Sequence, residues 1–243
     1  MVAGVASVPC ALTGRSASAA RVPGPDPSNA RCLLKGTRIS TATSDRPVQE
    51  LQIGEAVHTL DGLKTIKWIG YNKFTKEEGT AWQDSVMPVR VARFALDDHT
   101  PQHDLYLSPR YYVYFNNVLI PVMYLINEAT IMRHMPSDMS VIQYYHLDLG
   151  THEVIYAEGA PVDSYFDDGS GRESFSNFGQ YARLYGSERQ SKMIPFAPML
   201  GYRKRRQNVL GLARYLISDV VDIRDAIQNA HDQIAKRAEA MLV

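Results

Sequence analysis

Cysteine is almost absent from this chain, which has only two among its 243 residues, Cys10 and Cys32. Two cysteines cannot build a disulfide framework, and the sequence contains neither a CxxC motif nor Cys/His zinc spacing. The scattered histidines show no ligand spacing either. We therefore expect neither a metal site nor a bound cofactor.

Net charge is also missing, because 26 Lys and Arg residues balance 26 Asp and Glu residues. A neutral chain has no overall attraction for polyanions, so we expect no nucleic-acid partner. The basic stretch Arg203-Lys204-Arg205-Arg206 could face an acidic partner, but a solvated basic segment, or pairing with Asp219, Asp222 and Asp225 of a neighbouring chain, explains it better. A long apolar run is lacking too, so we expect no transmembrane segment.

Residues 1–31 are rich in Ala, Ser, Gly and Pro and offer little apolar surface to bury. Such a composition cannot offset the entropy lost on ordering, so we predict a flexible leader. The sequence Ala17-Ser18-Ala19 would suit a cleaved secretion signal, but the leader has no basic start. Both a cytoplasmic and a secreted location therefore stay open.

Short β-like runs separated by turns fill residues 32–167. Residues 47–60 alternate apolar and polar side chains, and Asp61-Gly62 then predicts a tight hairpin. A second hairpin is indicated where Asn116-Asn117 joins two apolar runs, because asparagine tolerates a left-handed backbone. Many short strands at close spacing predict an all-β body with a barrel-like or horseshoe-like sheet.

Two segments follow the β body. Residues 168–206 are polar, contain scattered aromatics and are weakly patterned, so we interpret them as a loop region wrapped around the body. Residues 207–243 carry apolar side chains at three- and four-residue intervals, which predicts a long amphipathic helix. Its apolar stripe could lie on its own domain or associate with a second copy of the chain, which would make a homo-oligomer.

The β body also contains an ordered set of motifs. They are Cys32-x-x-x-Gly36-Thr37-Arg38-Ile39, Val48-x-x-Leu51-x-Ile53-Gly54-Glu55-x-Val57, Lys67-Trp68-Ile69-Gly70, Leu107-Ser108-Pro109-Arg110-Tyr111-Tyr112-Val113 and Tyr145-His146-Leu147-x-Leu149-x-x-His152-x-Val154. Together they resemble the Hint fold, which is shared by the autoprocessing part of Hedgehog proteins and by inteins. Within that family, the sequence resembles the bacterial, Hedgehog-like branch. The resemblance implies a horseshoe-like all-β Hint domain over residues 32–167.

The resemblance implies self-processing that begins with a thiol. In the family, a cysteine at the start of the first strand attacks the preceding carbonyl, so that an amide becomes a thioester. Cys32 occupies this place, which makes Arg31-Cys32 the expected cleavage site. The family's Thr-x-x-His block reads Ser108-Pro109-Arg110-Tyr111 here. Ser108 can replace the threonine hydroxyl, but Tyr111 cannot replace the histidine, because a phenol titrates near about pH 10.

Two histidines could take over the proton transfer. His146 lies where inteins often carry an aspartate or another catalytic group, and His152 lies where they carry a histidine before the final strand. Either could instead be a hydrogen-bonded residue of the core or its rim. The expected catalytic set is therefore Cys32, Ser108, His146 and His152.

Splicing is not expected. Splicing inteins end in His-Asn, because cyclisation of the asparagine severs the downstream bond, whereas this chain has Val162-Asp163-Ser164 at the matching place. The remaining outcome is cleavage, with the chain's own leader as substrate and water, a thiol or an unknown nucleophile as acceptor. The alternative is a degenerate Hint module, inactive because of Tyr111, that acts as a binding or oligomerisation unit.

Overall fold

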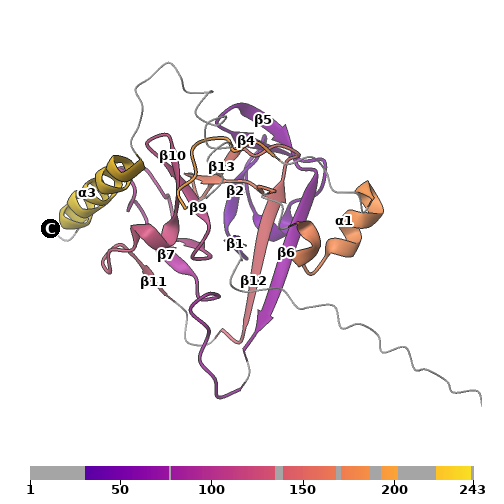
Figure 1. The fold of residues 1–243 in the computed structure, drawn as a ribbon, viewed down its shortest axis with the longest axis horizontal. Coiled ribbons are helices and arrows are strands. Elements are labelled where there is room, and N and C mark those ends of the chain that lie inside the picture. Colours follow the sequence, from indigo (N-terminus) through magenta and orange to yellow (C-terminus); the bar gives the residue numbers. More distant parts are fainter. Residues whose placement is uncertain are drawn as a thin grey trace, which may run out of the picture.

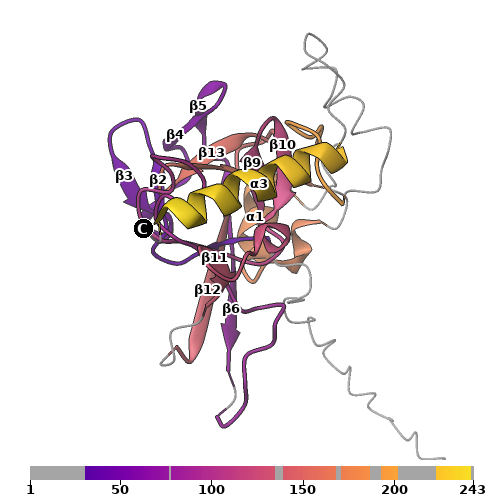
Figure 2. The ribbon, with the colours of Figure 1, turned by 90° about the vertical axis from the view of Figure 1, so that its left-hand side faces the viewer.

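The computed structural model describes residues 31–76, 78–134, 139–167, 171–186, 193–201 and 223–241. Most of the predicted leader and the N-terminal part of the predicted long helix lie outside these ranges. The described residues form a β body with helices α1 (Phe178–Tyr185) and α3 (Ile223–Met241) on opposite sides of it (Figures 1 and 2).

The first sheet places the start of the β body at its centre. In spatial order its strands are β11 (Ile131–Arg133), β7 (Val89–Val91), β8 (Leu105–Leu107), β1 (Leu33–Leu34), β12 (Val141–Asp148) and β6 (Trp68–Thr75). Leu33 of β1 pairs antiparallel with Leu107 on one side and with Tyr145 on the other. Because β1 is an inner strand, the residue just before it, Cys32, lies inside the body.

The second sheet has eight strands among the described residues. In spatial order its strands are β10 (Val118–Pro121), β9 (Tyr112–Phe115), β14 (Ala160–Asp163), β13 (Val154–Ala157), β2 (Arg38–Ser40) and β3 (Asp45–Pro47). A hairpin of β4 (Ala56–Thr59) and β5 (Gly62–Thr65) joins it through β13. All strand pairs of the two sheets are antiparallel in the described part of the chain, and the predicted all-β fold is confirmed.

Local turn chemistry forms the two predicted hairpins. Asn116 and Asn117 have φ values of 48° and 65° and join β9 to β10. At the other hairpin the strands close at Thr59 and Gly62, and Gly62 has a φ of 94°, which favours glycine. Residues 48–55 differ from the predicted strand: a 3₁₀ turn, η2 (Val48–Glu50), comes first, and β4 begins only at Ala56.

Helical segments cover the body at several places. Two short 3₁₀ turns, η3 (Val122–Leu125) and η4 (Arg172–Ser174), accompany α1 and α3. Helix α3 lies against β10 and η3 (Figure 2). Its residues Ala230, Ile234 and Ala238 are buried at four-residue spacing, as expected of an amphipathic helix. This described half of the apolar stripe packs on its own domain, and association with a second copy stays a prediction.

A close approach between β6 and the segment before α1 depends on a glycine. A Cβ atom at Gly70 would lie 2.7 Å from the Phe175 ring, so only glycine lets this ring pack against the strand. Phe175 in turn makes an edge contact with Trp68, with 5.3 Å between the ring centres. The region after the β body is thereby held against the first sheet. No described helix has the length and apolar character needed to cross a membrane.

Candidate active site

Cys32 is held by the residue that follows strand β8. The Cys32 N–H donates to Ser108 Oγ at 2.8 Å, and the Ser108 N–H donates to the Cys32 carbonyl at 2.9 Å. The two residues are 76 positions apart in sequence, so the sheet brings them together. The amide nitrogen of the Arg31-Cys32 bond therefore has a hydroxyl group as its direct neighbour.

The Cys32 thiol is free and only 1% exposed. Burial raises its pKa well above the ordinary value, and the nearby negative charge of Asp163 raises the pKa further, while the Arg31 backbone and charge oppose the shift. The thiolate is thus scarce at neutral pH. A reaction at this sulfur needs a proton acceptor within the site.

Asp163, at the end of β14, is a candidate for this proton acceptor. It is fully buried, and its Oδ1 accepts the Tyr112 N–H at 3.2 Å. Its Oδ2 has no hydrogen-bond partner in the part of the chain that the structure describes. A buried carboxylate oxygen without a partner is costly, which is typical of functional sites. The sequence places Asp163 where splicing inteins carry their final His-Asn, and this match to an ionisable residue is the one sequence signal of a role for Asp163 in the reaction.

Tyr111 is fixed in this site as a hydrogen-bond donor. Its buried hydroxyl donates to the Asp163 carbonyl at 2.5 Å. Burial, followed by the charges of Asp163 and Cys32, raises the Tyr111 pKa well above its usual value. The phenol therefore stays protonated at neutral pH and does not shuttle protons, as the sequence indicates.

His146, in β12, lies between aromatic rings of the site. Its ring centre is 5.3 Å from that of Tyr111 and 5.5 Å from that of Tyr165. Burial lowers its pKa to about 4, although the Asp163 charge and a hydrogen bond with the Ser164 backbone oppose this shift. The ring is neutral at pH 7, and its Nε2 has no hydrogen-bond partner among the described residues. His146 thus has a nitrogen lone pair open to a proton, but its lowered pKa makes it a weak base.

His152 is oriented by a residue far along the chain. The Phe196 N–H donates to His152 Nδ1 at 3.0 Å, so the proton of the neutral ring resides on Nε2. That Nε2 lies 3.7 Å from Asp163 Oδ2, which is too long for a hydrogen bond but short enough for electrostatic contact. His152 therefore acts on the Asp163 carboxylate.

A buried arginine closes the site on the side of α1. Arg172 Nε contacts Asp148 Oδ2 at 2.7 Å, and a second guanidinium nitrogen contacts Asp167 Oδ2 at 2.9 Å. The guanidinium carbon lies 4.7 Å from the ring centres of both Tyr165 and Tyr181. Because Tyr165 also contacts His146, the arginine cluster supports one wall of the site.

The assembled groups can perform nucleophilic and acid-base chemistry. A buried thiol, a hydroxyl on the neighbouring amide, an unpartnered carboxylate oxygen and a neutral imidazole lie in one region. Within the described residues, no group of three or more His, Cys, Asp or Glu side chains could hold a metal ion.

Solved intein and intein-like structures are similar to part of this chain. A comparison with curated proteins found no match. Among solved structures, the chain is similar to the crystal structure of the gp41-1 intein, with 12% identity, a TM-score of 0.38, and coverage of 55% of this chain and 98% of that one. It is also similar to the solution structure of a bacterial intein-like domain from Clostridium thermocellum, with 10% identity, a TM-score of 0.39, and coverage of 56% and 100%.

A match to a family model covers the whole β body. Residues 31–169, more than half of the chain, match the model of the Hint domain. The match begins one residue before Cys32 and extends beyond the last strand, β14, so it includes the whole β body and the thiol with its neighbours. The chain therefore belongs to the Hint domain family.

Proposed function

We propose that this Hint domain cleaves its own chain between Arg31 and Cys32, without splicing. Membership of the family supports a self-processing module in general. The observation that carries the specific proposal is the reciprocal hydrogen bonding of Cys32 and Ser108, which holds the scissile amide beside the thiol. Holding reacting groups in place in this way lowers the entropic cost of the attack.

The reaction begins as an N-to-S acyl shift. The Cys32 sulfur loses its proton and bonds to the Arg31 carbonyl carbon, which gives a tetrahedral oxyanion. When this species collapses, the C–N bond breaks and the Cys32 nitrogen gains a proton. The products are an Arg31 thioester and a free Cys32 amine. Water or another nucleophile then takes the acyl group and releases the Cys32 thiol.

Asp163 and His146 are the proton carriers in this proposal. Transfer of the thiol proton to the Asp163 carboxylate moves a negative charge within the buried site, which costs less than creating a new one. His146 is neutral at pH 7 with an unpartnered Nε2, so it can take up and return a proton. His152 positions Asp163, and the Ser108 hydroxyl, which accepts the Cys32 N–H, holds the leaving nitrogen in place while a proton carrier protonates it.

The absence of splicing follows from the groups beside β14. Asp163 and Ser164 occupy the place where a splicing reaction needs an asparagine, and the Ser164 hydroxyl accepts the Glu153 N–H at 2.9 Å. Neither an aspartate nor a serine side chain has the amide nitrogen through which an asparagine cyclises. The proposal therefore ends with two products, the leader and the remaining chain.

Intact-mass measurement of the purified chain tests the proposal. With hydroxylamine, which attacks thioesters, we expect the loss of a mass equal to residues 1–31. Cys32→Ala should abolish this loss, and Cys10→Ala, which removes the other cysteine, should retain it. A full-length species that persists with hydroxylamine in the unaltered protein would contradict the proposal.

A second candidate is a Hint module that has lost its reaction and persists as a binding or oligomerisation unit. The observation that favours it is Tyr111, whose buried hydroxyl is committed to the Asp163 carbonyl. The test is Tyr111→His, with Tyr111→Phe as a matched control that removes only the hydroxyl. If the unaltered chain is inert and the histidine variant alone cleaves, this second candidate holds.

A further inference from the structure

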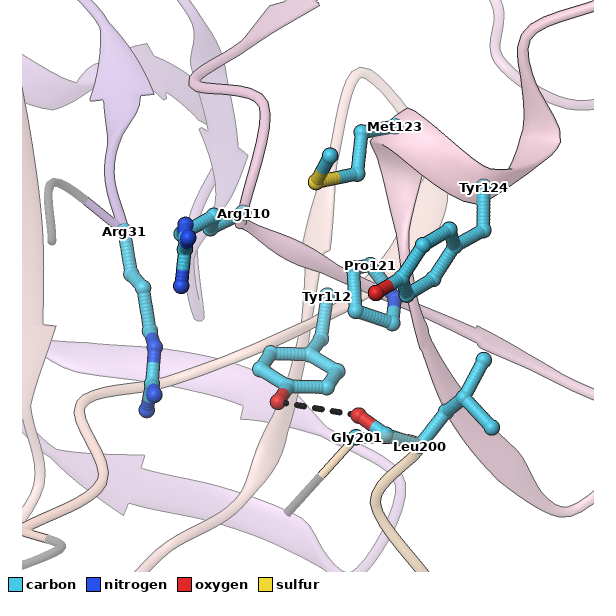
Figure 3. A pocket seen from close by; sticks show the side chains of 8 residues that line it. All are labelled: Arg31, Arg110, Tyr112, Pro121, Met123, Tyr124, Leu200 and Gly201. Carbon is cyan, nitrogen blue, oxygen red and sulfur yellow. Dashed lines mark hydrogen bonds between the residues drawn. The ribbon is translucent and has the colours of Figure 1, made fainter. Parts of the chain in front are cut away.

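A pocket of about 120 Å³ opens beside the proposed cleavage site (Figure 3). Its lining residues are Arg31, Arg110, Tyr112, Pro121, Met123, Tyr124, Leu200 and Gly201. The two arginines lie on one side of the pocket, and the tyrosines, Pro121 and Leu200 lie on the other. The pocket is thus cationic at one end and apolar with phenol groups at the other.

The pocket and the reaction centre share one segment of chain. Ser108 and Tyr111 belong to the reaction centre, whereas Arg110 and Tyr112 line the pocket. Arg31 belongs to both, because its carbonyl is the proposed site of attack and its side chain is a wall of the pocket. A molecule held here would therefore lie next to the acyl group that the thioester presents.

The charges of the pocket select the kind of molecule. Two guanidinium groups of like charge on one side favour an anion between them, and guanidinium groups bind carboxylate and phosphate in preferred geometries. The Arg31 guanidinium is 5.5 Å from the centre of the Tyr112 ring, and the Tyr112 hydroxyl donates to the Leu200 carbonyl at 3.2 Å. This bond fixes the phenol, while Pro121, Met123 and Leu200 offer apolar surface to a short carbon skeleton.

We propose that the pocket binds the acceptor of the acyl group and that this acceptor is a small anionic nucleophile. This inference rests on the proposed self-cleavage. With a thiol as acceptor, its sulfur loses a proton to solvent and bonds to the Arg31 carbonyl carbon. The bond from that carbon to the Cys32 sulfur breaks, and the Cys32 thiolate gains a proton. The leader leaves as a new thioester.

The dual position of Arg31 has a consequence for product release. When the acyl group is transferred, Arg31 departs with the leader, and the pocket keeps only Arg110 of its two cations. The site then attracts an anion less strongly than before. The remaining chain therefore binds the anionic group of the product only weakly, because one of the two cations has left with the leader.

Thiols of different charge test the proposal on the full chain. The probes are 3-mercaptopropionate, which is anionic, 2-mercaptoethanol, which is neutral, and cysteamine, which is cationic. Each cleavage rate is divided by the rate of the same thiol with a short peptide thioester ending in arginine, which removes differences in intrinsic reactivity. We expect the normalised rate to be about fivefold higher for the anionic than for the cationic thiol, and the preference to fall at high salt.

Variants of Arg110 assign the preference to the pocket. Arg110→Met should bring the ratio of anionic to cationic rates close to one, and Arg110→Lys should retain most of it because the charge remains. Arg93→Met removes an exposed arginine that does not line the pocket and should leave the ratio unchanged.

The outcomes separate this inference from the proposed function. If hydroxylamine releases no leader from the unaltered chain, the self-cleavage proposal fails. If hydroxylamine releases the leader but the normalised thiol rates show no charge preference, or a preference that Arg110→Met retains, the acceptor site is wrong while self-cleavage stands.

Discussion

Two buried polar clusters lie next to each other in this molecule, and they differ in how their charges are matched. In the first, the Arg172 charge is matched by both Asp148 and Asp167 and lies over two tyrosine rings, although its Nη2 has no hydrogen-bond partner among the described residues. In the second, around Cys32, no Lys or Arg side chain of the described residues pairs with the buried Asp163 carboxylate, and one of its oxygens has no hydrogen-bond partner there. The Tyr165 ring contacts both clusters, through Arg172 and through His146.

The difference separates support from reactivity. A buried ion pair with good geometry resists the removal of either partner, because the remaining charge would be left without compensation. Groups that lack partners can change their protonation at lower cost, since fewer interactions are lost when a proton moves. We therefore assign a structural role to the Arg172 cluster and the chemistry to the Cys32 cluster.

The largest expected effect is the loss of the Arg172 pairs. Arg172→Met leaves Asp148 and Asp167 in the interior without their partner and should lower the free energy of unfolding by about 3–5 kcal/mol. The measurement is urea unfolding at pH 7. The control, Arg133→Met, removes a surface pair with Asp84 and should cost less than about 1 kcal/mol. Equal losses in the two variants would contradict the assigned structural role.

Acid should destabilise the fold through the second cluster. The His146 pKa is lowered to about 4 in the folded state, so the unfolded chain takes up this proton first as pH falls from about 6.5. The free energy of unfolding should therefore fall by roughly 3 kcal/mol as the pH is lowered from about 6.5 to about 4. Urea unfolding across this range measures the slope. His146→Gln should flatten this slope, whereas His58→Gln, at an exposed position, should leave it unchanged. Identical slopes in the two variants would refute the attribution to His146.

The reaction itself should respond to the unpartnered carboxylate. Asp163→Asn keeps the shape of the side chain but removes its basicity, and leader release should slow by about 100-fold. A time course of intact masses gives the rate. Asp84→Asn, at an exposed carboxylate, is the matched control. If the Asp163 variant kept full activity, Asp163 would not be the base and another group would have to accept the thiol proton.

The smallest effect is expected at Ser108. Ser108→Ala removes the oxygen that accepts the Cys32 N–H, and leader release should slow by about tenfold. Ser108→Thr should retain most of the rate, because the hydroxyl is preserved. Thr59→Val removes a comparable acceptor of a backbone N–H in the β4–β5 hairpin and should leave the rate unchanged. A rate loss of equal size at Thr59 would mean that stability alone explains the effect.

Features set by neighbouring residues could be predicted from the sequence. The turn at Asn116-Asn117 and the hairpin near Gly62 depend on local backbone preferences, and both form. The pairing of Cys32 with Ser108 was within reach because the resemblance places both in one family pattern. The all-β fold follows from many short runs of this kind.

Features set by distant residues could not be predicted in the same way. Nothing near Asp163 in sequence indicates that its charge acts on Cys32, since the fold brings the two within electrostatic range. Helix α1 has eight residues, too few to show a clear period in a polar region. The contacts of Arg172 and of the Phe196 N–H likewise depend on packing against the finished body.

The bond from the Phe196 N–H to His152 connects the site to residues beyond those that match the family, which end at position 169. A ribosome adds Phe196 long after it has added Cys32, and a growing chain that stops before Phe196 lacks the donor that orients His152. The order of synthesis thereby delays completion of the site. In the proposed reaction, the leader then stays attached until the domain that follows it has been made.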